Sequence, residues 1–410
     1  MAAVNTPTTL ASRLKEVYPN GITELVPKCN ELFGKRLKFR KDLKPGELVR
    51  LDVQLSPENG FSCGVGDFTL NDPVAQVSAK AEISDIGVCL RSRVSYDAIT
   101  RARDDKQAFV TFNDSKYIPA AESFKTRCEL LSMGYGRQGL GVLSADDDGA
   151  GVLTISAATW APAMWMTMIG AVLQSYTALT GGSQHDGDMV VTAVDVANRQ
   201  ITVSGTSTSQ ATGDILFLKG HRGVAPIGLM DIAKNTGTLY NISAASYDLW
   251  KANSYDVGTS ALTLGKIALA AAKSADKGCN EDLTCLVPTA AFQALVTDQS
   301  ALREHGADYK HSEAETGFES IVFWGATGKI RVVPYMFSKQ GEFVMFPERY
   351  TSIIGSEEGT NQVDKSGDVY FDLPDSAAKE LRFFACFTVY SDRPGWITWG
   401  NRSDGLALHT

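Results

Sequence analysis

The chain has 410 residues, of which 44% are hydrophobic and 21% charged, and its formal net charge is -8. This balance is typical of folded proteins with a core, and the length allows two or three domains. The mild negative charge excludes a protein that coats nucleic acid with its whole surface, so any contact with DNA would be local.

The cysteines point to a reduced environment. There are seven, scattered along the chain, and the polar N-terminal segment does not resemble a secretory signal. This pattern favours free thiols in a protein made in a cytoplasm. Cys279 and Cys285 are the closest pair, but no further ligands follow them at zinc-site spacing. We therefore predict no bound metal.

The N-terminal segment is expected to begin with a helix around Leu10 to Val17, followed by a second from Thr23 to Phe33. Residues 28 to 50 are basic, with eight Lys or Arg against three Asp or Glu, so the local charge is 8 - 3 = +5. Such a segment is either a solvated arm or one that meets phosphate or an acidic neighbour. The candidate contact residues are Lys28, Lys35, Arg36, Lys38, Arg40, Lys41 and Lys44.

Residues 47 to 112 are predicted to form β strands with little core of their own. Apolar and polar residues alternate from Glu47 to Val53, and prolines and glycines interrupt the following stretch. A long two-stranded hairpin that extends from the rest of the chain fits this pattern better than a compact domain. Because an isolated hairpin is only marginally stable in water, this one is expected to need a partner surface.

Residues 114 to 133 are predicted to form a helix, with Pro119 near its start, where proline is tolerated. A glycine-rich run ends it and contains GxGxxG from Gly134 to Gly139. A dinucleotide site needs this motif between a strand and a helix. Because the motif follows a helix here, we interpret it as a chain-reversing loop.

Residues 149 to 184 contain no Asp, Glu, Lys or Arg. Polar residues, a proline and a glycine interrupt the apolar part and no basic cluster flanks it, so we reject a transmembrane helix. A helix that is apolar on all sides is instead buried in a core or between subunits. The candidate packing residues are Trp160, Trp165 and Met166.

The remaining chain alternates strands and helices. A hairpin is predicted around Ala197 to Gln200, followed by a strand from Ile215 to Leu218. Residues 226 to 372 are expected to form a mixed α/β unit, with a polar loop at 355–368. Its predicted helices lie at about 259–277 and just after Pro288, and its predicted strands at 283–287, 321–324, 329–335 and 342–347. A strand pair, 381–390 with 396–400, is expected at the end.

No recognisable catalytic or cofactor motif is present. None of the five histidines lies in HExxH, and no GxxxxGK[ST] loop occurs. Asp146 to Asp148 resemble the start of a calcium loop but lack its later ligands. We therefore predict no catalytic residue and no cofactor, which favours a structural role over an enzyme.

Several sequence segments resemble those of the major capsid proteins of tailed bacteriophages, the Hong Kong 97-type family. The run ELLSMGYGRQGLG, from Glu129 to Gly141, is similar to the spine-helix exit of that family. Residues 191–203 are like its peripheral-domain hairpin, and residues 213–229 look like the crossing into its axial domain. The order of these features covers nearly the whole chain.

The resemblance implies an α+β, Hong Kong 97-type capsid fold. The implied parts are an N-terminal arm (1–46), an extended β loop (47–112), a peripheral domain with the spine helix and a β-hairpin (113–225), an axial domain (226–374), and C-terminal strands that return to the peripheral domain (375–410).

The implied function is a non-enzymatic subunit of an icosahedral phage head, located in the virion and assembled in the host cytoplasm. Its implied partners are copies of itself as hexamers and pentamers, a separate scaffolding protein, a portal, decoration proteins, and packaged double-stranded DNA bound without sequence specificity. No membrane is involved.

Three alternatives stay open. An encapsulin-type compartment shell would keep the fold and enclose a cargo enzyme. A nucleotide-dependent enzyme would use Gly134 to Gly139. Another phage structural part, such as a tail or baseplate protein, would differ in its copy number per particle.

Overall fold

The structure is a computed structural model that describes residues 27–40, 48–96, 117–146, 149–205, 209–297, 320–361, 370–373 and 376–410, without the side chains of 186 and 357–370. The chain divides into two compact units. The first comprises Met1–Val26, Cys89–Phe124 and Thr360–Phe384, and the second comprises Pro27–Val88, Lys125–Gly359 and Ala385–Thr410.

The second unit contains a small antiparallel sheet whose two ends meet. In sheet order its strands are β5 (Gly141–Val142), β10 (Ile215–Leu218), β7 (Val172–Tyr176), β8 (Gln184–Asp195), β9 (Gln200–Gly205) and β6 (Val152–Thr154). Leu143 forms an antiparallel bridge with Ile155, and the Ser144 N–H donates to the Thr154 carbonyl at 2.9 Å. The sheet therefore closes into a barrel, and β8 and β9 form the predicted hairpin.

The uncharged stretch 149–184 does not form one long helix, so that expectation was wrong. It contains β6, the short helix α3 (Pro162–Met166) and β7. Gly170 follows α3 with a φ of +83°, a left-handed conformation that a helix cannot continue through. Burial of the stretch is confirmed at its two tryptophans, Trp160 and Trp165, whose rings stack with centroids 6.3 Å apart.

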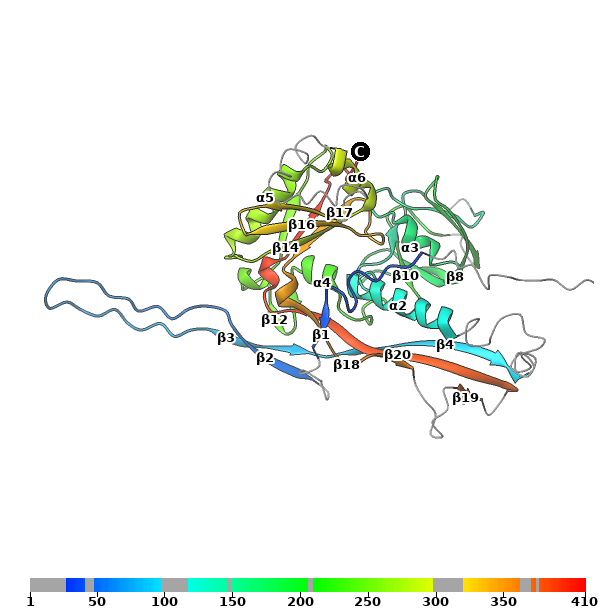
Figure 1. The fold of residues 1–410 in the computed structure, drawn as a ribbon, viewed down its shortest axis with the longest axis horizontal. Helices are drawn as coiled ribbons and strands as arrows, with labels where there is room; N and C mark the ends of the chain where they lie inside the picture. The colour runs from blue at the N-terminus through cyan, green and yellow to red at the C-terminus, as the bar shows by residue number, and fades with distance from the viewer. Residues whose placement is uncertain are drawn as a thin grey trace, which may run out of the picture. The chain divides into compact units, whose positions relative to one another are not determined.

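A six-stranded mixed sheet forms the second core of this unit (Figure 1). In sheet order its strands are β13 (Asn253–Asp256), β21 (Thr398–Asn401), β17 (Glu342–Phe346), β14 (Leu283–Val287), β16 (Lys329–Pro334) and β15 (Ile321–Trp324). Helices α5 (Leu264–Asp276) and α6 (Thr289–Thr297) share one apolar core with these strands. Thr263 caps α5 by accepting the Lys266 N–H at 3.4 Å, and Gly278 follows its end with a φ of +84°.

Long strands form a further sheet. In the second unit, β1 (Lys38–Phe39) runs parallel to β18 (Thr351–Asn361), which pairs with β20 (Ala378–Ser391). The predicted polar loop at 355–368 therefore begins as strand. The hairpin strands β2 (Val49–Gln54) and β3 (Ser78–Ile83) pair with each other. Short elements complete the unit: α4 (Leu229–Ala233), β11 (Thr238–Leu239), β12 (Ile242–Ser243), η2 (Asp248–Trp250) and η4 (Glu348–Tyr350).

The C-terminal strands do not pair with each other, so the predicted strand pair was wrong. The return of this segment to the peripheral domain stays a prediction. β20 pairs with β18, and β21 lies between β13 and β17 in the mixed sheet. The segment between them forms a 3-10 turn, η5 (Pro394–Trp396), rather than a hairpin turn. The two strands on either side of this turn belong to different sheets.

In the first unit, two strands flank the beginning of β20. β4 (Ile86–Ser95) pairs with β20, and β19 (Tyr370–Asp372) pairs with it in antiparallel register. The predicted helix is confirmed as α2 (Ile118–Met133), which starts in this unit and continues into the second. Phe124 of α2 stacks on Phe383 of β20 with ring centroids 5.9 Å apart.

Candidate assembly surfaces

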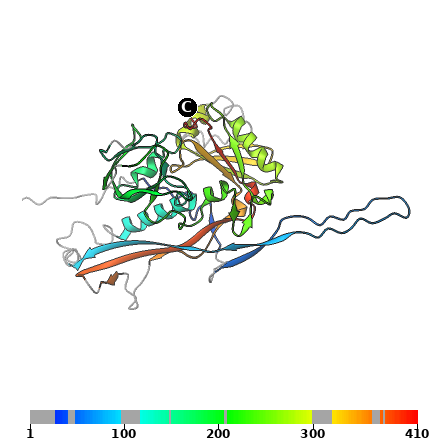
Figure 2. The same cartoon turned by 180° about the vertical axis from the view of Figure 1, so that it is seen from behind.

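The hairpin that joins β2 to β3 carries a cluster of exposed apolar side chains. Its strands pair from Val49↔Ile83 to Gln54↔Ser78, and Figure 1 and Figure 2 show the two arms (blue) continuing side by side beyond them. In that continuation Phe61, Val65 and Leu70 are 83%, 101% and 74% exposed. Because monomeric proteins rarely expose contiguous apolar surface, this hairpin tip is suited to contact a partner.

The arm at residues 27–40 is anchored to α2 by one buried carboxylate. Glu129 accepts the backbone N–H groups of Glu31, Leu32 and Phe33 at 3.1, 2.8 and 2.7 Å. Burial raises the pKa of Glu129, although these hydrogen bonds oppose the rise. Residues 27–33 are not helical, so this part of the helix predicted from Thr23 to Phe33 was wrong, because Glu129 accepts N–H groups from an open loop. The helix predicted around Leu10 to Val17 lies outside the described residues.

The basic residues of the arm differ in their contacts and in their exposure. Ion pairs within the chain include Lys35–Glu31 at 2.7 Å, Arg36–Glu348 at 2.6 Å and Arg40–Asp392 at 3.8 Å. Lys28 and Lys38 are exposed, while Lys41 and Lys44 lie outside the described residues. Contacts of these side chains with neighbouring subunits or DNA stay a prediction.

The three candidate packing residues differ in burial. Trp160 and Trp165 are 2% and 0% exposed, which confirms that they pack inside the chain. Met166 is 39% exposed and therefore is not buried within the subunit. Its packing between subunits stays a prediction.

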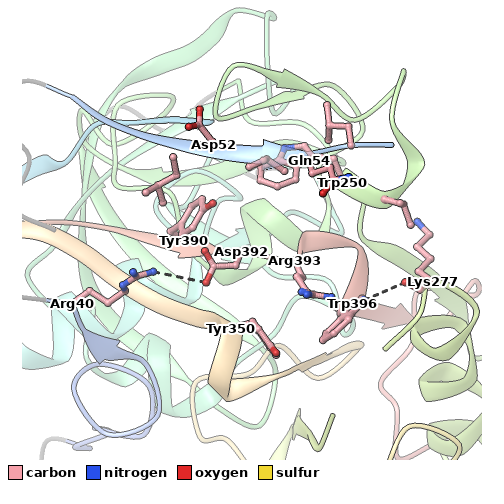
Figure 3. Close-up of a pocket in the computed structure, with 14 residues that line it drawn as sticks. Arg40, Asp52, Gln54, Trp250, Lys277, Tyr350, Tyr390, Asp392, Arg393 and Trp396 are labelled. Carbon is pink, nitrogen blue, oxygen red and sulfur yellow. Dashed lines mark hydrogen bonds and ion pairs between the residues drawn. The ribbon is translucent and has the colours of Figure 1, made fainter. Parts of the chain in front are cut away.

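A cavity of about 580 Å³ lies beside the base of the hairpin, between β2 and the turn η5 (Figure 3). The guanidinium of Arg393 lies 4.3 Å from the ring centre of Trp396 and 5.1 Å from that of Tyr350. The described lining contains no Ser, Cys or His. It therefore offers hydrophobic and cation–π contacts for binding.

Three arginines surround one buried carboxylate in the first unit. Glu380 is fully buried and accepts from Arg91 at 2.6 and 2.8 Å and from Arg382 at 2.5 Å, with Arg93 at 3.4 Å. These hydrogen bonds, led by that of Arg91, lower the pKa of Glu380 to about 2. This cluster was not predicted. Arg91 and Arg93 alternate along β4 in the sequence, but the sequence does not reveal that β4 pairs with β20.

The GxGxxG run is the predicted chain-reversing loop after α2. A Cβ on Gly136 would lie 2.6 Å from that of Ala225, and one on Gly139 would lie 2.4 Å from the Ile215 side chain. These glycines therefore allow close packing of the chain on itself. They do not stand between a strand and a helix that could bind a pyrophosphate.

We also expected no GxSxG pattern, and the sequence does contain one. Residues 60–64 read GFSCG and match the GxSxG pattern of a nucleophile elbow. Ser62, however, lies in the hairpin between β2 and β3 and accepts the Asn71 N–H at 2.7 Å. A nucleophile elbow needs a turn between a strand and a helix, so the match carries no chemistry here.

The described residues contain no group of three or more His, Cys, Asp or Glu that could hold a metal ion. None of the helices in the described ranges combines the length and hydrophobicity needed to cross a bilayer. All seven cysteines lie in the described part of the chain and form no disulfide.

Comparison with known proteins identifies the fold. No protein-family model matches the chain, and no curated protein is similar to it in sequence. Among solved structures, it is similar to the cyanophage A-1(L) capsid asymmetric unit, with a TM-score of 0.54, 12% identity, and 99% and 100% of the two chains covered.

Capsids of GTA particles are also similar. That of the empty particle gives a TM-score of 0.53 at 7% identity, covering 98% of this chain and 99% of the other. That of the native particle gives 0.51 at 7% identity, with the same coverage. The chain thus has, over nearly its full length, the α+β fold of tailed-phage capsid proteins, the Hong Kong 97-type fold.

Proposed function

We propose that this chain is the major capsid protein of a tailed bacteriophage, a subunit that assembles with its own copies into a closed head shell. The observation that carries the proposal is the hairpin tip with its exposed Phe61, Val65 and Leu70. A tip of this kind has no core of its own and is stabilised by covering the surface of another molecule. The shared fold supports a shell subunit as that molecule.

The chain acts through its surfaces and not as an enzyme. The cavity beside η5 lacks Ser, Cys and His in its described lining, and the GxGxxG loop is filled by its own chain. The nucleotide-dependent enzyme is therefore the weakest alternative. An encapsulin-type compartment keeps the fold, and the contents of the shell distinguish it from a phage head.

Assembly as hexamers and pentamers follows from this proposal, because a closed shell repeats the same weak contacts many times. A separate scaffolding protein, a portal and decoration proteins are the proposed partners. The packaged double-stranded DNA is confined and not tightly bound, in keeping with a net charge of -8. The proposed location is the virion, after assembly in the host cytoplasm.

Residues 1–46, 47–112, 113–225 and 226–374 are proposed to act as arm, extended loop, peripheral domain and axial domain. The barrel and α2 lie in the third of these ranges, and most of the mixed sheet lies in the fourth. Only β21 comes from outside that fourth range, since it follows β20.

The test is electron microscopy of the full chain, overexpressed alone and together with the products of neighbouring genes. We expect closed shells of uniform size when the neighbouring gene products are present. Uniform shells from the chain alone would count against a separate scaffolding protein. In infected cells, particles that protect double-stranded DNA from nuclease support the phage head, whereas shells that contain an enzyme and no DNA support the encapsulin alternative. A monomer in every preparation contradicts the proposal.

A further inference from the structure

The outermost strand of the mixed sheet carries an exposed tryptophan. Among the described strands, β15 pairs only with β16 and so forms an edge of the sheet. Along β15, Ile321 and Phe323 are buried in the core, while Val322 and Trp324 are 40% and 75% exposed. Most of the Trp324 side chain is therefore open to a partner, with Lys329 beside its ring.

A cavity of about 290 Å³ lies on the same side of the sheet, since Val322 lines it together with residues of β16. Small-molecule sites span roughly 300–1,000 Å³, so this cavity has room for about one large side chain and not for a cofactor. Three basic and three acidic side chains line it, so its formal charge is 3 - 3 = 0. They are Lys329, Arg331, Arg349, Glu281, Asp282 and Glu348.

We propose that Trp324 of one copy inserts into this cavity of a second copy; the inference rests on the proposed function, which it deepens by naming an interface. A lining with equal numbers of both charges complements a surface like itself. It does not suit the phosphates of nucleic acid, which require a net positive site. A second copy brings both charge signs and the tryptophan together.

The chemistry of the cavity matches an indole ring. Arg331 and Arg349 are exposed, and a guanidinium binds the face of tryptophan through cation–π attraction. Lys329 already shows this preference within the chain, with its Nζ 5.2 Å from the ring centre of Trp324. The indole N–H needs an acceptor when it is buried, and the carboxylates of Glu281 and Asp282 line the cavity.

The contact is able to repeat from copy to copy, because each chain carries both the tryptophan and the cavity. Tryptophan is enriched among the few residues that dominate interface energies, particularly when it fills a pocket surrounded by polar groups. The mixed-sheet edge therefore supplies a second assembly contact, independent of the hairpin tip.

The test compares the full chain with its Trp324→Ala and Leu269→Ala variants. Leu269, on α5, is 60% exposed and serves as a matched control. We expect both variants to unfold at the temperature of the parental chain. Sedimentation should show at least a tenfold loss of assembled material for Trp324→Ala and no loss for Leu269→Ala.

A second measurement tests directly whether Trp324 is buried by a second copy. Oxidative labelling with mass spectrometry should show Trp324 protected in assembled particles and reactive in unassembled subunits. Normal assembly of Trp324→Ala, or equal reactivity of Trp324 in both states, overturns this inference and leaves the proposed function standing. A parental chain that never assembles overturns both.

Discussion

Glu129 shows how one side chain can hold together segments that are about a hundred residues apart. The carboxylate is buried on α2, where a charge is costly unless hydrogen bonds satisfy it. The N–H groups of Glu31, Leu32 and Phe33 supply these bonds. The arm is therefore fixed to the helix at this point, whatever its basic residues contact elsewhere.

Replacing Glu129 with Ala leaves three N–H donors without this acceptor, a buried one on Leu32 and part-buried ones on Glu31 and Phe33. A buried unsatisfied donor costs about 1–3 kcal/mol and a part-buried one costs less, so we expect a loss of about 3 kcal/mol in the free energy of unfolding. Glu129→Gln retains one carbonyl oxygen and should lose less. Urea denaturation measures both, with the exposed Glu58→Ala as control. A Glu129→Ala chain as stable as this control would contradict the anchoring role.

Glu380 predicts a dependence of stability on pH. Its hydrogen bonds to Arg91 and Arg382 lower its pKa in the folded chain to about 2, below the ordinary value of 4.5. An acid with a lowered folded pKa stabilises the fold above its unfolded pKa, and this contribution is lost as the pH falls through the folded value.

We therefore expect the parental chain to melt at a higher temperature than Glu380→Gln at pH 6. The gap should narrow from about pH 4.5 downwards and close near pH 2. Thermal melts of the two chains across this range measure the gap. A difference that stays constant from pH 6 to pH 2 would show that the arginine cluster does not stabilise the ionised carboxylate.

At the scale of elements, α2 ends where its glycine-rich exit packs against the start of α4. A Cβ on Gly228 would lie 2.2 Å from the Gly134 nitrogen and 2.6 Å from the Leu131 carbonyl oxygen. Gly228→Ala must therefore displace backbone, and we expect a loss of about 3 kcal/mol, the upper end of overpacking costs. Chemical denaturation should show no comparable loss for Gly237→Ala, where no atom lies within 4 Å.

The hairpin tip should matter for assembly and not for folding. Phe61 and Leu70 are exposed in the subunit, so replacing both with Ser should change its unfolding free energy by less than about 0.5 kcal/mol. Shell yield measured by sedimentation should fall sharply. The control pair Val224→Ser with Leu269→Ser removes apolar surface of similar exposure elsewhere. Equal shell yields from the two double variants would show that the hairpin tip does not contribute to assembly.

Elements with a strong local pattern could be predicted from the sequence. The period of α2 and the alternation in β8 and β9 are encoded within a few residues, and the structure confirms them. The uncharged stretch 149–184 was misread because its hydrophobicity indicates burial but not secondary structure. The partners of β20 and β21 are strands far away in the sequence, which no local pattern reveals.

Some candidate surfaces could be predicted from the sequence and others could not, for the same reason. The hairpin without a core could be predicted, because its alternation of apolar and polar residues is interrupted by prolines and glycines. The buried Glu129 and the arginines around Glu380 were not, since each joins residues far apart in the sequence. The basic arm residues were chosen by charge alone, and the structure pairs Lys35, Arg36 and Arg40 with acids of the same chain.

At the scale of the whole molecule, the fold and the exposed surfaces both favour assembly of the chain with its own copies. The chain has the fold of solved phage capsids over nearly its full length, and its largest exposed side chains include those of the hairpin tip and Trp324. Many weak contacts of this kind become stable when symmetry repeats them. The central claim is that copies of this chain cover one another.

Electron microscopy of the purified full-length chain, expressed with its neighbouring gene products, tests that claim most directly. We predict closed shells of uniform diameter built from this chain. A monodisperse monomer at every concentration, with no shell in any preparation, would contradict the account.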